Sequence, residues 1–113
     1  EWMNQGTLTQ CNTGSFVGYF GKTVQKRAEE LLYNHMVTLL GSDAHRIAFR
    51  STNTKDASMA ITKLAGGREI WEACRHNAAM VLQDKVLYPE LPKQWKEQRH
   101  SVLTRLVHTF SLR

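Results

Sequence analysis

Residues 36–45 read MVTLLGSDAH, an apolar run followed by two side chains that can ligate metals. The run is rich in aliphatic and β-branched residues and ends at Gly41, a pattern that predicts a buried strand. Asp43 and His45 would leave the same face if the backbone stayed extended beyond the strand. Such a pair suits Mn, Fe or Zn, and α/β barrels place their chemistry at this end of their strands. A lone D-x-H motif is also typical of a turn with a capping Asp, so the surrounding sequence has to decide between the two.

The spacing of apolar residues predicts strands and helices in alternation. We expect strands at 7–12 and 36–40, and helices at 22–35, 55–64, 68–74 and 77–82. Gly66-Gly67 separates the second helix from the third, and Asn77 would be the N-cap of the fourth. This order of elements is the signature of the α/β class, which is the fold class predicted here.

The last part of the chain departs from this pattern. Pro89 and Pro92 end helical structure, so residues 1–87 are predicted as one domain and residues 88–93 as a linker. Residues 94–112 place apolar side chains on one helical stripe and basic ones on other faces, which predicts a basic amphipathic helix. Two interpretations stay open: this helix packs back onto its own domain, or it binds a partner or a membrane surface.

Composition restricts the class of protein. Of the 113 residues, 42% are hydrophobic, an ordinary share for a globular domain. The sequence contains no apolar stretch of about 18 residues, so we predict no transmembrane helix. The net charge is +5, a balance that can suit nucleic acids, anionic membranes or acidic substrates. We interpret it as an ordinary surface excess and expect no nucleic-acid partner.

Four motifs in a fixed order connect the chain to a known family. They are GTLTQ at 6–10, TGSFVGYFGK at 13–22, AEELL at 28–32, and SDAH at 42–45 followed by Arg50. In this order the chain resembles the C-terminal half of bacterial metal-dependent protein-tyrosine phosphatases of the capsule or exopolysaccharide type. These enzymes belong to the polymerase and histidinol phosphatase (PHP) superfamily, and the segment from Gly14 to Lys22 distinguishes them from its other members.

The resemblance implies the C-terminal part of a distorted TIM-like (β/α)7 barrel, with two parallel strands, flanking helices and the C-terminal amphipathic helix. Barrels of this kind have about 200 residues or more, so we expect the chain to be an incomplete enzyme, inactive alone. The family's H-x-H, mid-chain Glu and H-P-E-R segments do not occur in the 113 residues.

The same resemblance implies roles for three residues. Asp43 and His45 would each hold an ion of a two- or three-ion cluster, commonly Mn, although other divalent metals would fit. Arg50 would act in catalysis by binding the substrate phosphate, because a planar guanidinium meets two phosphate oxygens at once. Cys11-Asn12 stands where the family usually has Val-Thr, a departure that we interpret as core variation.

Cys11 and Cys74 lie far apart in the sequence and lack C-x-x-C spacing. We expect two reduced, buried thiols, as is usual in the cytoplasm. Neither begins a C-x5-R loop like that of thiol-dependent phosphatases, because Val17 and Met80 stand six residues beyond them. This disfavours a covalent cysteine mechanism and favours metal-assisted hydrolysis.

The implied function is hydrolysis of phosphotyrosine by metal-activated water. The implied partner is the C-terminal tail of a bacterial tyrosine kinase that controls capsule or exopolysaccharide synthesis, in the cytoplasm. Two alternatives stay open. One is a non-catalytic remnant that binds a partner or membrane surface through its basic C-terminal helix, and the other is a PHP phosphoesterase acting on a small phosphomonoester.

Overall fold

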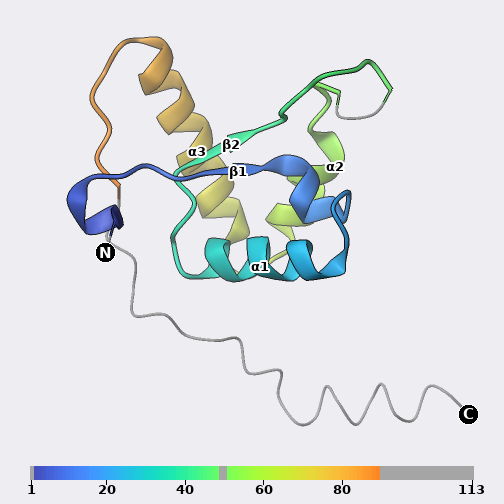
Figure 1. Ribbon diagram of the computed structural model, residues 1–113. Coiled ribbons are helices and arrows are strands. Elements are labelled where there is room, and N and C mark those ends of the chain that lie inside the picture. Colours follow the sequence, from blue (N-terminus) through green and yellow to red (C-terminus); the bar gives the residue numbers. More distant parts are fainter. Residues whose placement is uncertain (1, 49–50, 90–113) are drawn as a thin grey trace, which may run out of the picture.

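The computed structural model describes residues 2–48 and 51–89 of the chain (Figure 1). Two short parallel strands and three α-helices, accompanied by two 3-10 helices, make up most of this part. In chain order the elements are η1 Trp2–Gln5, β1 Gln10–Asn12, η2 Thr13–Val17, α1 Lys22–Tyr33, β2 Leu39–Gly41, α2 Lys55–Thr62 and α3 Gly67–Leu82. The predicted α/β class is confirmed.

The two strands pair in parallel, and α1 connects them. The register consists of three residue pairs: Gln10 with Leu39, Cys11 with Leu40, and Asn12 with Gly41. Both strands are shorter than the predicted ranges 7–12 and 36–40. The Thr9 carbonyl accepts the N–H groups of both Thr38 and Leu39, each at 3.0 Å, and the regular ladder begins only beyond this shared acceptor. Parallel pairing brings the carboxyl ends of both strands to the same edge of the sheet.

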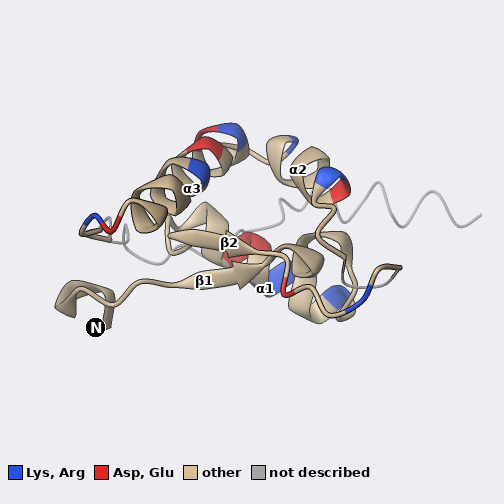
Figure 2. Ribbon diagram, turned by 90° about the horizontal axis from the view of Figure 1, so that it is seen from above, with Lys and Arg blue, Asp and Glu red and all other residues tan. Residues whose placement is uncertain are grey.

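One hydrophobic cluster joins the three helices to the sheet. Its buried members are Phe16, Ala28, Leu32, Val37, Ile61, Ile70 and Cys74. Phe16, Leu32 and Ile61 are the largest of the almost fully buried side chains, each at most 1% exposed. Helices α2 and α3 lie next to each other along one side of the strands (Figure 2). Burying one such side chain stabilises the fold by about 1.5–3 kcal/mol, so the cluster holds the sheet in place.

Helix α1 ends at Tyr33, two residues before the predicted end. The side-chain amide of Asn34 donates to the Glu30 carbonyl at 2.8 Å and closes the last turn. His35 then takes a left-handed backbone conformation, with φ 57°, which is a common way for a helix to stop. His35 therefore lies just outside the helix that was predicted to include it.

Helix α3 begins where two adjacent glycines meet, and the predicted break there is confirmed. Gly66 has a φ of 70°, a left-handed conformation that glycine adopts without strain. A Cβ atom on Gly67 would lie 1.8 Å from the carbonyl oxygen of Ile61. Only a residue without a side chain permits this close approach between the start of α3 and the end of α2.

The prediction of two separate helices at 68–74 and 77–82 is wrong, because α3 is continuous from Gly67 to Leu82. Asn77 lies inside the helix instead of capping it. Its side-chain amide donates to the Thr38 carbonyl, just before β2, at 2.9 Å. A turn-favouring side chain is tolerated within the helix because a tertiary partner satisfies it.

Two predicted segments reach past the described residues. The predicted linker at 88–93 is described only as far as Pro89, and the predicted amphipathic helix at 94–112 lies outside the described residues. Among residues 2–48 and 51–89, no helix combines the length and the hydropathy needed to cross a membrane.

Candidate metal centre

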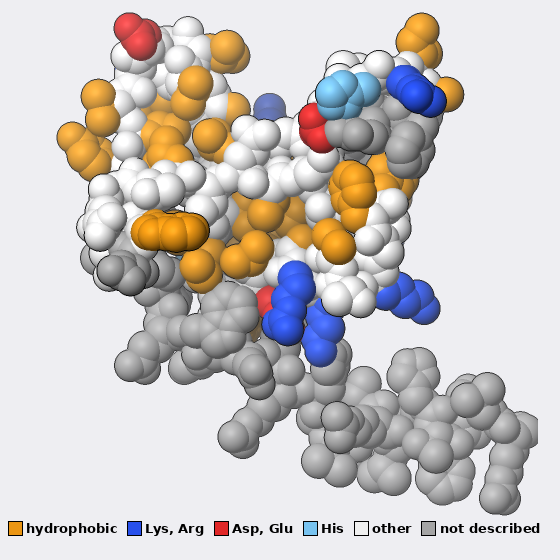
Figure 3. Space-filling view, in the orientation of Figure 1, with side chains coloured by type: hydrophobic (Ala, Val, Ile, Leu, Met, Phe, Trp, Pro, Cys, Tyr) orange, Lys and Arg blue, Asp and Glu red, His pale blue; other side chains and the backbone are white. Residues whose placement is uncertain are grey.

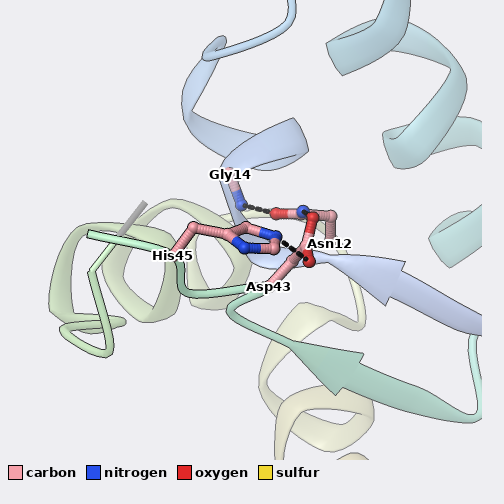
Figure 4. Close-up of polar contacts among 4 residues, drawn as sticks. All are labelled: Asn12, Gly14, Asp43 and His45. Atoms are coloured by element: carbon pink, nitrogen blue, oxygen red, sulfur yellow. Dashed lines mark hydrogen bonds and ion pairs between the residues drawn. The ribbon is translucent and has the colours of Figure 1, made fainter. Parts of the chain in front are cut away.

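The predicted site lies at the carboxyl edge of the sheet. Asn12 is the last residue of β1 and pairs with Gly41, the last residue of β2. Asp43 and His45 follow β2 by two and four residues. Because parallel strands end at the same edge, the side chains after β2 come close to the end of β1 (Figure 4).

The backbone does not stay extended through this segment, so the reason given for the pairing of Asp43 and His45 is wrong. Strand β2 stops at Gly41, and Asp43 has a φ of 48°, in the left-handed region. Asp is one of the few residues besides glycine that adopt this conformation with little strain. The pairing itself is confirmed, because Asp43 Oδ1 lies 3.0 Å from His45 Nε2 (Figure 4).

A third polar residue, which the sequence analysis missed, contacts the pair. The Asn12 side-chain amide donates to Asp43 Oδ2 at 3.2 Å. Its oxygen accepts the backbone N–H of Gly14 at 2.9 Å and thereby caps η2. The interpretation of Asn12 as core variation is therefore wrong. The signal that could have identified it is its place at the end of a strand predicted to run parallel to residues 36–40.

The pair is open to solvent. The side chain of His45 is 60% exposed and that of Asp43 is 47% exposed. An ion pair this exposed contributes little to folding stability, typically about 0–1 kcal/mol. Two hollows in the described part, of about 160 and 250 Å³, are not lined by either residue. The arrangement is therefore a surface edge that a ligand can reach, rather than an enclosed pocket.

The donor atoms suit a divalent metal but do not complete a site. A carboxylate oxygen and an imidazole nitrogen are accepted by Mn, Fe and Zn, and here they already lie 3.0 Å apart. Protein sites usually supply about three or four ligands. No group of three His, Cys, Asp or Glu side chains that could hold an ion occurs in the part of the chain that the structure describes. The residues fit as a portion of a metal site.

The cysteines do not offer a nucleophile. Both are free, as predicted; Cys74 is buried and Cys11 partly so. Burial raises the pKa of both thiols, and burial together with the neighbouring Cys11 raises the pKa of Cys74 to about 11. Cys74 Sγ lies 3.7 Å from the Val37 carbonyl, a weak hydrogen bond in the core. Protonated, buried thiols are poor nucleophiles, which supports the expectation against a cysteine mechanism.

Arg50, the predicted phosphate ligand, lies outside the described residues, and its role stays a prediction.

The fold and the site together define an α/β protein with an exposed carboxylate–imidazole pair at the carboxyl edge of its strands. The family described as "Capsular polysaccharide synthesis, CpsB/CapC" matches residues 1–83, and the chain belongs to this family.

Individual relatives agree with this membership. Over 97 residues the chain is 25% identical to the tyrosine-protein phosphatase YwqE of Bacillus subtilis, covering 86% of this chain and 38% of the relative. It is 27% identical over 99 residues to CapC of Staphylococcus aureus, covering 88% of this chain and 38% of CapC.

The fold is also similar to a crystal structure from work on YwqE and on CpsB of Streptococcus pneumoniae, which are described as metal-dependent tyrosine phosphatases. The TM-score is 0.72 at 26% identity, covering 82% of this chain and 37% of the other. The chain therefore spans about 38% of the length of the curated relatives it matches.

Proposed function

We propose that this chain is the C-terminal part of a metal-dependent protein-tyrosine phosphatase and that Asp43 and His45 belong to its metal centre. The observation that carries the proposal is the 3.0 Å pairing of carboxylate and imidazole at the carboxyl edge of a parallel sheet. The chain that carries it belongs to the CpsB/CapC family, and its relative YwqE is named a tyrosine-protein phosphatase.

The surface supports a larger assembly around this part. Large hydrophobic side chains are exposed at the end of α3 and beyond it, including Leu82 at 89% and Tyr88 at 84%. Figure 3 shows hydrophobic side chains gathered around this end of the molecule. Exposed apolar clusters usually mark surfaces that another segment or protein covers. We expect the additional segments of the longer relatives to pack there.

Each residue of the site has a chemical task in this proposal. Asp43 would contribute an anionic oxygen and His45 a neutral imidazole nitrogen, a donor set that suits Mn. Divalent cations at such a centre stabilise negative charge on a phosphoryl group and lower the pKa of water. Arg50 would bind the phosphate oxygens of the substrate. The open edge leaves room for a tyrosine side chain on a protein surface.

The biological setting is proposed from the family. The substrate would be a phosphotyrosine protein, specifically the tail of a bacterial tyrosine kinase in capsule or exopolysaccharide synthesis, and the enzyme would work in the cytoplasm. Residues 88–93 and 94–112 would form a linker and a basic helix beyond the barrel portion, which we propose to be residues 1–87.

The decisive experiment joins residues 1–113 to the N-terminal region of YwqE that this chain does not cover. The chimera should hydrolyse para-nitrophenyl phosphate with Mn, and a chelator should remove the activity. Asp43→Asn and His45→Ala should reduce the rate to the chelated level. Arg50→Ala should cost a charge-assisted contact worth about 1.5–3 kcal/mol of transition-state binding. Activity that survives the chelator would contradict the proposal.

Matched controls come from the same chain. Asp84 also has a left-handed backbone, with φ 55°, so Asp84→Asn controls for Asp43→Asn. His76 is an exposed residue of α3, so His76→Ala controls for His45→Ala. Neither control should change the rate. Comparing a phosphotyrosine peptide with histidinol phosphate separates the proposal from a small-molecule phosphoesterase, because the proposal requires preference for the peptide.

A further inference from the structure

We infer that Asn12 is a positioning residue for Asp43: its amide orients the carboxylate that meets His45. The inference rests on the proposed function, because it concerns the same site. Asn12 reaches the site from β1, whereas Asp43 and His45 both follow β2, so the contact joins residues 31 positions apart. Outer partners of this kind hold metal ligands in the orientation that binding needs.

The orientation of the Asn12 amide is determined by its two partners. The backbone N–H of Gly14 can only donate, so the side-chain oxygen must face it, at 2.9 Å. The side-chain nitrogen then faces Asp43 Oδ2 at 3.2 Å. A flipped amide would place two donors together at Gly14 and two acceptors together at Asp43, so only one orientation satisfies both partners.

The two oxygens of Asp43 are divided between two partners. Oδ2 accepts from Asn12, and Oδ1 lies 3.0 Å from His45 Nε2 (Figure 4). A half-turn about the Cβ–Cγ bond only exchanges the two equivalent oxygens, and any smaller rotation weakens both contacts. The amide of Asn12 therefore limits the directions in which Oδ1 can point, although the Asp43 side chain is 47% exposed.

Asn12 is itself held by the core. It caps η2, the short 3-10 helix that contains Phe16, and Phe16 is 1% exposed in the central hydrophobic cluster. The exposed carboxylate of Asp43 is thus connected, through the amide of Asn12 and helix η2, to the hydrophobic core. This is the physical basis for assigning a positioning role, rather than a merely capping role, to Asn12.

The two roles can be separated by substitution. Ser is as good an N-cap as Asn, so Asn12→Ser keeps a cap for η2, but its hydroxyl is too short to reach Asp43. Asn53 provides a matched control, because its oxygen accepts the Lys55 N–H at 3.0 Å just before α2. Asn53→Ser therefore changes an asparagine whose side chain accepts a backbone N–H two residues on, as that of Asn12 does, away from Asp43 and His45.

The first test follows the broadening of amide and side-chain NMR signals by Mn²⁺ in the 113-residue chain, a method that detects weak sites. Broadening should centre on Asp43 and His45 and should disappear in His45→Ala. Asn12→Ser should weaken the apparent affinity about tenfold, the lower end of the effect of removing such a partner. Asn53→Ser should match the wild type.

A second test needs no metal. One of the two Asn12 side-chain N–H signals should lie downfield of the other, as expected for a hydrogen bond to a carboxylate. Asp43→Ala should move it upfield, and Asp84→Ala should leave it in place. Should Asn12→Ser fail to fold, this measurement on wild type and Asp43→Ala decides the question.

The outcomes separate the two proposals. Should the 113-residue chain alone hold too little Mn²⁺ to broaden Asp43 and His45, the chimera with the YwqE region decides the metal centre, and the metal-free signal decides the role of Asn12. Broadening in the wild type that is equally strong in Asn12→Ser would overturn the positioning role and leave the metal centre standing. An Asn12 side-chain N–H signal whose chemical shift is the same in Asp43→Ala as in the wild type would also overturn the positioning role.

Discussion

The helix-covered core and the carboxyl edge of the sheet differ in how complete they are. In the core, Phe16, Leu32 and Ile61 are each at most 1% exposed, with partners from every α-helix. At the edge, Asp43 and His45 remain 47% and 60% exposed, although they contact each other and Asp43 contacts Asn12. The described residues thus contain most of what their packing requires and only part of what their chemistry requires.

The largest expected effect is in the core, at Ile61. Ile61→Ala should lower the free energy of unfolding by about 2–5 kcal/mol, because a fully buried side chain leaves a cavity among α1, α2 and α3. The matched control is Ile47→Ala, since Ile47 is 98% exposed in the loop after β2 and should change stability by less than about 0.5 kcal/mol. Urea unfolding followed by circular dichroism measures both. Equal losses would mean that the cluster is not the stabilising core.

An effect of intermediate size on the free energy of unfolding is expected from the buried thiol of Cys74. The pKa of Cys74 is raised from its ordinary value of 9.0 to about 11, so between these values the unfolded chain releases a proton that the folded chain keeps. Stability should therefore be unaffected below pH 9.0 and fall as the pH rises toward about 11, by less than about 3 kcal/mol. Urea unfolding across this range, compared with Cys74→Ala, isolates the effect, because the variant retains every other titrating group. A variant that loses stability just as steeply would contradict the assignment.

The smallest expected effect concerns the edge. Asp43→Ala should lose about 1–2 kcal/mol because Ala is strained at a φ of 48°, whereas Asp43→Asn should lose less because Asn tolerates that conformation. Asp84 has a φ of 55° and supplies the reference pair, Asp84→Ala and Asp84→Asn. Thermal unfolding of the four variants gives the comparison. If Asp43→Asn is as damaging as Asp43→Ala while the Asp84 pair behaves as expected, the charge of Asp43 matters more to folding than its backbone.

Much of the fold could be predicted because the buried face of a helix places apolar residues at a regular spacing in the sequence. The apolar spacing predicts helices at 22–35 and 55–64. The structure confirms both, each ending two residues earlier, and Gly66-Gly67 marks the start of the third helix. The division of α3 at Asn77 was wrong for a reason that sequence does not contain. Asn77 remains helical because its side-chain amide donates a hydrogen bond to the Thr38 carbonyl. That carbonyl lies next to Asn77 only in the folded chain.

The site shows the same limit. Asp43 and His45 are neighbours in sequence, so their pairing could be predicted even though the backbone geometry was not. Asn12 comes from another strand, 31 residues earlier, and no local pattern links it to Asp43. Only the parallel register, with Asn12 opposite Gly41, brings the amide to the carboxylate.

The long connection between β1 and β2 also determines when the site can assemble. Closing a loop of this length costs conformational entropy, and non-local strand pairing is slow compared with the formation of a single helix. Helix α1, which fills much of the connection, can form early, whereas Asn12 meets Asp43 only after the strands have found their register. An ion that depends on this contact is therefore a ligand of the finished fold and does not nucleate folding.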